Sequence, residues 1–210
     1  MLESNKINPQ LTEYCKAYVL PHYEINESGH GIEHIEYVLR RCFILAEQFS
    51  SIDCDILYTI AVYHDIAHHI DKKNHEKLSA EMFINDKFMK SFFTDDYRQI
   101  IKEAIEDHRA SAKTTPRSDY GKIISSADRS TDIDEFLRRT HSYTLKHFNP
   151  KTVNEIIDRA YEHAMDKYGE KGYAKHYLKD EEYDIFITKI RELLKDKSIF
   201  TEYYRKITGI

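Results

Sequence analysis

The sequence predicts an all-α protein, and three observations support this fold class. Only six glycines and four prolines occur in 210 residues, too few turn-forming residues for a sandwich or barrel with many tight turns. Apolar residues recur at helical spacing along almost the whole chain. Asn, Asp or Thr precedes most of these segments, as expected for helix N-caps. With 41% hydrophobic residues, the chain can build a sizeable core, which argues against disorder.

Six helices are predicted before residue 129. The first begins at Asn8-Pro9, with Asn as the cap and Pro in the first turn. The second covers about residues 31–49. The next three begin after the predicted caps Asp53, Asn74 and Thr94. A polar loop at residues 111–119 separates them from a sixth helix that leads to Asp128.

The remainder of the chain is also helical in pattern but more polar. Asn149-Pro150 and residues 169–172 predict two breaks. A last helix is predicted from Asp180 to about Ile207, and its apolar positions are Ile185, Phe186, Ile190 and Leu193. Three roles are open for these C-terminal helices: capping a cleft, extending the bundle, or making a homodimer contact.

Charge, glycine and cysteine usage exclude several classes of protein. A net charge of −5 without a long basic block disfavours binding to a nucleic acid polymer. The glycines fit no dinucleotide fingerprint, phosphate loop or nucleophile elbow. Three cysteines without CxxC spacing argue against disulfides and a cysteine zinc site. A polar N-terminus and the lack of a run of about 20 apolar residues predict a cytoplasmic protein without a membrane partner.

Ionisable residues on or beside the apolar stripes are the main functional signal. These residues are His34, His64, His108 and Asp128, and Asp65 adjoins His64. Ionisable groups are seldom buried unless they are paired or bound to metal. One histidine on an apolar face is most often a satisfied core residue. Several on separate helices predict convergence on one interior point, as in helix-bundle metal sites.

Imidazole and carboxylate groups together bind a divalent first-row metal. Such an ion lowers the pKa of a bound water from about 15.7 to about 7, which provides hydroxide at neutral pH. The residue types do not single out one metal. Mn, Mg, Fe, Zn, Ni and Co all remain candidates, and either one ion or two is open.

The order His34, His64-Asp65, Asp128 resembles the HD superfamily of metal-dependent phosphohydrolases. The resemblance covers roughly residues 28–135. Its three motifs are GHGIEHIEYV at 29–38, AVYHDIA at 61–67 and SSADR at 125–129. It implies an HD-domain-like helical bundle with a C-terminal helical extension. Residues 1–135 are then the metal-binding core with its N-terminal helix, and residues 136–210 are helices packed on the same domain.

The resemblance also implies a set of site residues. The metal ligands are expected to be His34, His64, Asp65 and Asp128. A metal-activated water would attack a phosphoester or phosphoanhydride in a nucleotide or similar small phosphate. Asp65 is expected to orient this water. His68 is expected to assist proton transfer, as in the triphosphohydrolase branch, or else to be a solvated helix-end residue.

Two further histidines, His75 and His108, resemble residues that bind a second metal or contact phosphate in some branches. Candidate phosphate contacts, with surface charge as the alternative, are Lys72, Lys73, Arg109 and Arg129. No role is assigned to the other histidines, which are His22, His30, His69, His141, His147, His163 and His176.

The sequence departs from each characterised branch of the family. It lacks the Gly-Tyr-Pro signature of the cyclic-dinucleotide branch, and His68-His69 replace the Glu-Asp pair of the alarmone hydrolases. Residues 70–73 (IDKK) replace the continuation of the triphosphohydrolases. The chain therefore resembles the small stand-alone HD hydrolases, with the substrate open. One alternative is a catalytically silent regulatory module that binds nucleotide or metal. The other is a helical interaction protein whose histidines are core residues.

Overall fold

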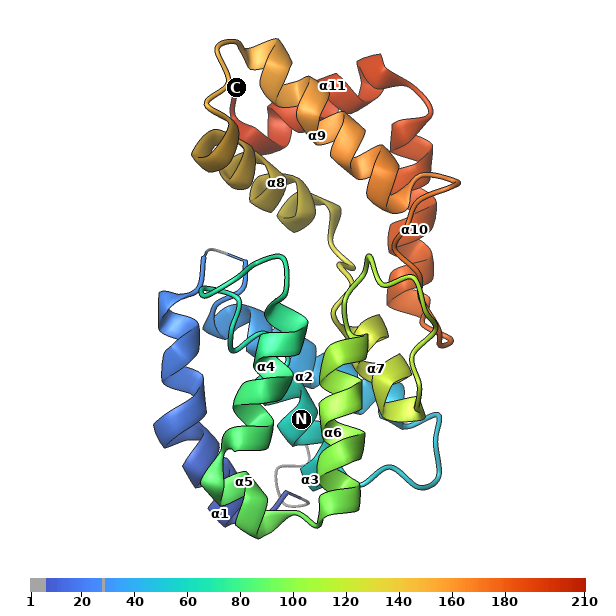
Figure 1. The fold of residues 1–210 in the computed structure, drawn as a ribbon. Helices are drawn as coiled ribbons and strands as arrows, with labels where there is room; N and C mark the ends of the chain where they lie inside the picture. The colour runs from blue at the N-terminus through green and yellow to red at the C-terminus, as the bar shows by residue number, and fades with distance from the viewer. Residues whose placement is uncertain (1–6, 28) are drawn as a thin grey trace. The chain divides into compact units, whose positions relative to one another are not determined.

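The computed structural model describes residues 7–27 and 29–210. Within these ranges all regular secondary structure is helical, with eleven α-helices and two short segments, one π-helical (Cys15–Val19) and one 3-10 (Leu20–Ile25) (Figure 1). The all-α prediction is therefore confirmed. None of the helices in the described part of the chain is long and apolar enough to cross a bilayer.

The chain folds into two compact units. The first runs to Asp128 and regains residues 176–179, whereas the second comprises residues 129–175 and 180–210. Hydrogen bonds tie residues 176–179 to the first unit. The Tyr177 N–H donates to Ser126 Oγ at 3.1 Å, and Gln48 Nε2 donates to the Lys179 carbonyl oxygen at 2.9 Å.

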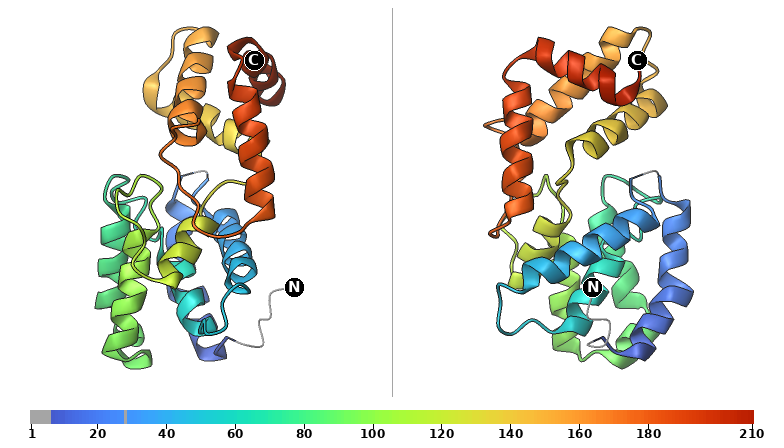
Figure 2. Two further views of the ribbon diagram at one scale, coloured as in Figure 1. Left: turned by 90° about the vertical axis from the view of Figure 1, so that its right-hand side faces the viewer. Right: turned by 180° about the vertical axis from the view of Figure 1, so that it is seen from behind.

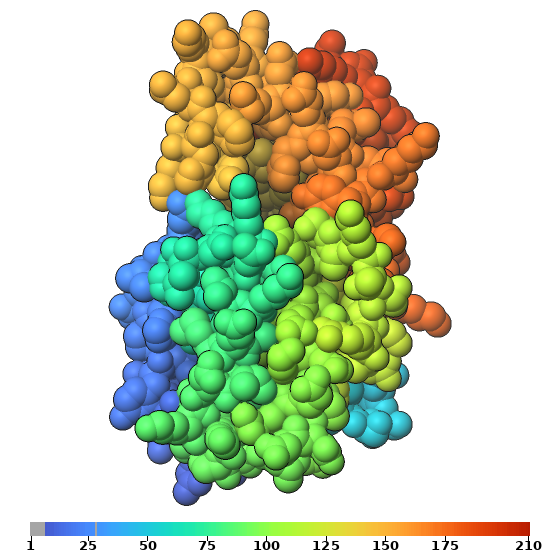
Figure 3. All heavy atoms as spheres, viewed as in Figure 1, coloured from blue at the N-terminus to red at the C-terminus, as the bar shows by residue number. Residues whose placement is uncertain are grey.

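The first unit is built around one central helix. Its α-helices are α1 (Pro9–Tyr14), α2 (Ile32–Ala46), α3 (Cys54–Tyr63), α4 (His75–Asn85), α5 (Lys87–Phe92), α6 (Asp95–Asp107) and α7 (Asp119–Ala127). Every α3 residue from Ile56 to Tyr63 is buried, as expected for a helix that is apolar all round. Helix α2 packs on one side of α3, and α4 and α6 lie on the other (Figure 2). Segments around α4 and α6 form one face of the unit, coloured teal and green in Figure 3.

Side-chain caps set several of the helix starts. Asn8, Asp53 and Thr94 cap their helices as predicted. Asn74 precedes α4 but makes no capping hydrogen bond with its side chain. Asp53 accepts two backbone N–H groups, from Asp55 at 2.9 Å and Ile56 at 3.1 Å, and so fixes the start of the central helix.

We expect Asp53→Ala to lower the free energy of unfolding by about 1 kcal/mol, because two N–H groups of the first turn lose their acceptor. Asp53→Asn keeps an acceptor oxygen and should change it by only a few tenths of a kcal/mol. Urea unfolding of the two variants beside wild type measures the difference. Equal stability of Asp53→Ala and wild type would contradict a capping role.

The second unit has a hydrophobic core of its own, formed by α8 (Ile133–Phe148), α9 (Val153–Tyr168), α10 (Glu181–Leu194) and α11 (Lys197–Thr208). The break predicted at Asn149 is present, and this residue ends α8 in the left-handed conformation with φ of 45°. Asn tolerates this conformation better than most residues because its short polar side chain can hydrogen-bond locally.

The predicted helices differ from the structure in three places. Helix α2 ends at Ala46 rather than residue 49, and α5 was not predicted. The single helix predicted from Asp180 to Ile207 is instead two helices, because Asp196 accepts the N–H groups of Ser198 and Ile199 and starts α11. A local side-chain acceptor of this kind competes with continuation of the preceding helix.

The predicted inward face of the last segment also needs correction. Ile185 is exposed and Leu193 only partly buried, whereas the residues facing the core of α10 are Tyr183, Phe186, Ile190 and Leu194. Phe186 and Ile190 thus face the core as predicted, and Tyr183 and Leu194 take the places predicted for Ile185 and Leu193.

Candidate metal centre

The predicted site residues lie at helix ends of the first unit. His34 is in the first turn of α2, and His75 is the first residue of α4. The C-terminal caps of α3, α6 and α7 are His64, His108 and Asp128. Carbonyl groups in the last turn of a helix lack a helical partner. A histidine placed there can therefore donate to one of them.

Three of the predicted ligands meet in a first cluster, which consists of His34, His64 and Asp128. The His34 Nε2 atom lies 3.3 Å from His64 Nε2 and 3.2 Å from Asp128 Oδ1. His64 Nε2 lies 3.9 Å from the same carboxylate oxygen. Asp65 Oδ2 approaches this cluster and lies 3.7 Å from both Nε2 atoms.

A second cluster consists of Asp65, His75 and His108. The two imidazole Nε2 atoms are 3.0 Å apart, and Asp65 Oδ1 lies 3.2 Å from that of His75 and 3.3 Å from that of His108. The single carboxylate of Asp65 therefore presents one oxygen to each cluster. The structure thus brings together all six residues predicted as first or second metal ligands.

The hydrogen bonds of the imidazoles fit a metal-binding role. The Nδ1 atoms of His64, His75 and His108 lie 2.7, 3.0 and 2.6 Å from carbonyl oxygens of residues three positions earlier. A carbonyl oxygen can only accept, so each Nδ1 carries a proton, and in a neutral ring Nε2 then carries a lone pair. The lone pairs of His75 and His108 face each other in the second cluster, and that of His64 faces the first. Metal-binding histidines typically have this arrangement, with the other ring N–H held by a carbonyl or carboxylate.

The Oδ1 atom of Asp65 is an independent indication that the site binds a cation. The atom is buried and accepts no conventional hydrogen bond among the described residues; its near neighbours are the Nε2 atoms of His75 and His108. A buried carboxylate oxygen without such a partner is costly. A divalent cation would satisfy this oxygen and the facing nitrogen lone pairs together. The donor set therefore fits the metal that the sequence predicts.

The electrostatics of the site match such a donor set. Burial works to raise the pKa of Asp65, but the neighbouring His64 and His30 imidazoles outweigh it and hold this pKa well below its usual range. The pKa of Asp128 is likewise lowered, by His34 and His64 against the effect of burial. Burial lowers the pKa of His64 to about 4. Two carboxylates and a neutral imidazole therefore face one another at neutral pH.

The second cluster differs from the first in the direction of the pKa shift of one histidine. Burial works to lower the pKa of His75, but the adjacent Asp65 carboxylate outweighs it, and the net shift is upward. Cation binding needs the neutral ring. An ion at this cluster therefore competes with a proton more directly than one at the first cluster.

His68, predicted to assist proton transfer, lies beside the clusters. Its N–H donates to the Asp65 carbonyl oxygen at 3.0 Å, within the turns that follow α3. Its ring packs edge-on to His75, with centroids 5.1 Å apart. Its Nδ1 atom is buried and has no hydrogen-bond partner in residues 7–27 and 29–210, and burial lowers its pKa to about 3. The predicted alternative, a solvated helix-end residue, is wrong because the side chain is buried.

His30 is the main residue of the centre that no sequence pattern predicted. Its Nδ1 atom lies 2.6 Å from Asp65 Oδ2, and its ring stacks on that of His68 with centroids 3.7 Å apart. Its position four residues before His34 was the available signal. Because the two side chains lie on a loop and on the following helix, helical periodicity did not connect them.

Tyr23 and Asn26 also hold the site in place, and no sequence pattern predicted a role for either residue. The Tyr23 hydroxyl donates to the Val62 carbonyl oxygen at 2.9 Å and accepts the Asp65 N–H at 3.1 Å. Asn26 Nδ2 donates to the carbonyl oxygens of His30 and Asp65 at 3.0 and 3.1 Å. The segment before α2 therefore fixes the backbone of Asp65 from two sides.

The four residues predicted to contact phosphate do not gather in one cluster as the predicted metal ligands do. Lys72 pairs with Glu27, and Arg109 pairs with Glu76 at 3.0 Å and also donates to the Lys73 carbonyl oxygen. Lys73 itself is exposed. Arg129 belongs to the second unit, where it is buried and its Nε donates to the Lys175 carbonyl oxygen at 3.2 Å. Lys72 and Lys73 thus lie just before His75 in the chain, and the fold brings Arg109 to the neighbouring Glu76.

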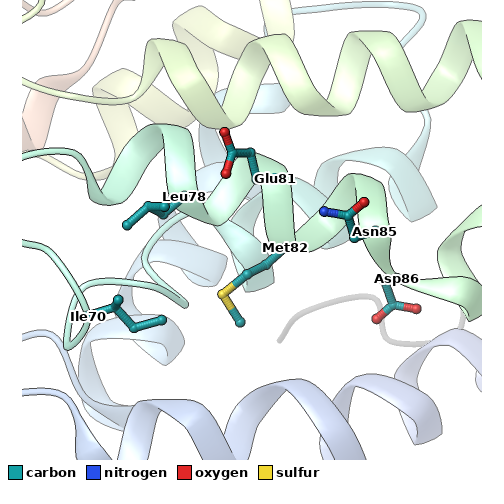
Figure 4. Close-up of a pocket in the computed structure, with 6 residues that line it drawn as sticks. All are labelled: Ile70, Leu78, Glu81, Met82, Asn85 and Asp86. Carbon is teal, nitrogen blue, oxygen red and sulfur yellow. The ribbon is translucent and has the colours of Figure 1, made fainter.

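Two side chains of the site are partly exposed to solvent. The side chains of His30 and Asp128 are 28% and 18% exposed, whereas His64 and Asp65 are buried. A separate hollow of about 370 Å³ lies along α4 (Figure 4). It is lined by Ile70, Leu78, Glu81, Met82, Asn85 and Asp86. Because this lining contains no imidazole, the convergent donors, rather than the hollow, mark the candidate centre.

Comparisons with known proteins identify one family. Residues 31–131 match the model of the family described as "HD domain", which confirms the resemblance seen in the sequence. No curated protein and no solved structure shows significant similarity to the chain.

Proposed function

Because this chain contains an HD domain over residues 31–131, we propose that it is a metal-dependent phosphohydrolase. It uses a metal-activated water to cleave a phosphoester or phosphoanhydride. The substrate is a nucleotide or a similar small phosphate.

The observation that carries the proposal is the position of Asp65 between two sets of histidines. One carboxylate oxygen lies 3.7 Å from the Nε2 atoms of His34 and His64, and the other lies 3.2–3.3 Å from those of His75 and His108. A carboxylate between two sets of nitrogen donors is suited to a pair of divalent cations. In the second cluster, carbonyl oxygens hold the Nδ1 atoms of both His75 and His108, so two neutral rings have no proton to share between their Nε2 atoms.

The residues have distinct tasks in this proposal. His34, His64 and Asp128 hold one ion, and His75 and His108 hold a second, with Asp65 shared. When bound, the metal supplies a hydroxide at neutral pH and neutralises charge on the phosphoryl group. Asp65 orients the attacking water, and the buried Nδ1 of His68 takes part in proton transfer.

The charged residues around the two clusters restrict the kind of substrate that the site can bind. Lys72 and Arg109 are already matched by Glu27 and Glu76, so the metal is the main anchor for phosphate. Lys73, which is exposed, is the candidate contact for a second phosphate group. This arrangement favours a small phosphate over a polymer, since a polymer needs a row of cations along its backbone.

A turnover assay tests the proposal. Metal-free protein is supplied with Mn²⁺, Mg²⁺, Co²⁺, Ni²⁺ or Zn²⁺, and release of phosphate and pyrophosphate is measured across nucleoside mono-, di- and triphosphates. We expect at least one metal to support turnover, and His64→Ala to lower it about a hundredfold or more, because a direct ligand matters more than its supporting partners. His147→Ala, at an exposed position of the second unit, is the matched control. Equal turnover in His64→Ala and wild type would contradict the assignment.

The ion pairs of Lys72 with Glu27 and of Arg109 with Glu76 support a second candidate function. If Glu27 and Glu76 keep Lys72 and Arg109 from the substrate, the chain is a silent module that binds metal or nucleotide for regulation. Saturable nucleotide binding without turnover under all five metals would favour this candidate. Turnover abolished by His64→Ala would exclude it.

A further inference from the structure

We propose that His30 is a positioning residue that orients the Asp65 carboxylate toward the ion held by the first cluster. The inference rests on the proposed function, because it concerns the same metal centre. It assigns a role to a histidine that lies outside the predicted ligand set.

His30 also forms, with His34 and Asp65, a group that could hold an ion, but its contact with Asp65 has the length of a hydrogen bond. His30 Nδ1 and Asp65 Oδ2 are 2.6 Å apart. Two ligand atoms at 2.0–2.1 Å from one ion and at right angles lie about 2.9 Å apart. The shorter separation fits a charge-assisted N–H···O bond. Both the Nδ1–H tautomer and the imidazolium can donate it, so the role does not depend on the charge of His30.

The oxygen that His30 contacts is the one that faces the first cluster. Asp65 Oδ2 lies 3.7 Å from the Nε2 atoms of His34 and His64, while Oδ1 faces the second cluster. A donor fixed on Oδ2 limits rotation of the carboxylate about its Cβ–Cγ bond. It therefore decides which oxygen each cluster receives.

His30 is itself held in place. The Asn26 side-chain amide bonds to the carbonyl oxygens of both His30 and Asp65, so the two backbones are tied together. The imidazole of His30 is stacked on that of His68, with ring planes 15° apart. A donor fixed in this way loses little conformational entropy when it orients its acceptor.

Removal of His30 should therefore weaken metal binding at the first cluster and leave the second cluster little affected. Partners that orient a metal ligand are typically worth 10–100-fold in metal affinity. Without His30, the carboxylate of Asp65 no longer has a fixed direction toward His34 and His64. The second cluster retains its two histidine donors and can still attract either oxygen of Asp65.

The test is a Co²⁺ titration of the metal-free protein, followed by visible absorption and calorimetry. In a His108→Ala background only the first cluster is intact, and we expect His30→Ala to weaken Co²⁺ binding 10–100-fold. In a His34→Ala background only the second cluster is intact, and we expect a change of less than about threefold. His30→Asn places an amide N–H near the lost Nδ1 and should restore most of the affinity.

His22→Ala is the matched control, since this histidine lies on the same segment but its ring faces His69 at 6.1 Å. Unchanged Co²⁺ affinity in His30→Ala with an intact first cluster would overturn the inference. Equal losses in the two backgrounds, or no recovery in His30→Asn, would also overturn it by showing a general structural effect. If wild-type protein binds no Co²⁺, the proposed function itself fails and this inference fails with it.

Discussion

Asp65→Asn is expected to lower kcat/KM by about a thousandfold or more and to weaken metal binding at both clusters. The amide has one oxygen and no charge, so it can present an acceptor to only one cluster and presents an N–H₂ group to the other. A metal ion contributes several kcal/mol of transition-state stabilisation, and about 4 kcal/mol corresponds to a thousandfold. Steady-state kinetics and elemental analysis of the dialysed protein measure the two effects.

Two comparisons make this result specific to the centre. Asp96→Asn removes a carboxylate from an exposed position in the first turn of α6 and should leave turnover and metal content unchanged. His108→Ala removes a donor from the second cluster alone, so it should lose one ion where Asp65→Asn loses affinity for two. Wild-type turnover with two bound ions in Asp65→Asn would contradict the shared role of this carboxylate.

Addition of Mn²⁺ to metal-free protein is expected to raise the melting temperature by about 8–16 °C. The donors come from the ends of α2, α3, α4, α6 and α7, and only the folded chain brings them together. An ion that binds only the native state at a thousandfold excess over its Kd stabilises it by about 4 kcal/mol. For a chain of this size each kcal/mol is worth about 2–4 °C.

Differential scanning calorimetry after dialysis against EDTA, with stepwise addition of Mn²⁺, measures this shift. The same additions to Asp65→Asn should give a much smaller shift, because the shared ligand is missing. A wild-type protein that gains no stability from Mn²⁺ or from any other divalent ion would favour the alternative in which the histidines are ordinary core residues.

The sequence predicted the helices best where the determining contacts are local. The start of α3 follows from Asp53, which caps backbone groups two and three residues away. The break at Asn149 likewise follows from local backbone preferences. The split of the last helix at Asp196 depends on an equally local cap, but the apolar pattern continues across it and concealed the break.

The metal centre was predictable in its members but not in its connections. The order of histidine and aspartate residues identified the residues that the fold brings together, through their resemblance to a family. No sequence pattern specified that the two oxygens of Asp65 face different clusters. That division depends on how the ends of α2, α4 and α6 are placed around α3.

By itself the sequence determined that the chain is helical, where most helices begin, and which residues are suited to bind a divalent cation. These properties depend on side-chain chemistry and on contacts within a few residues. Only the tertiary structure decided that Asp65 lies between two histidine clusters and that His30 donates to it. The contacts of Asp65 with His30, His34 and His108 join residues 31 to 43 positions apart. Packing of whole helices around a common core, rather than any local preference, sets their distances.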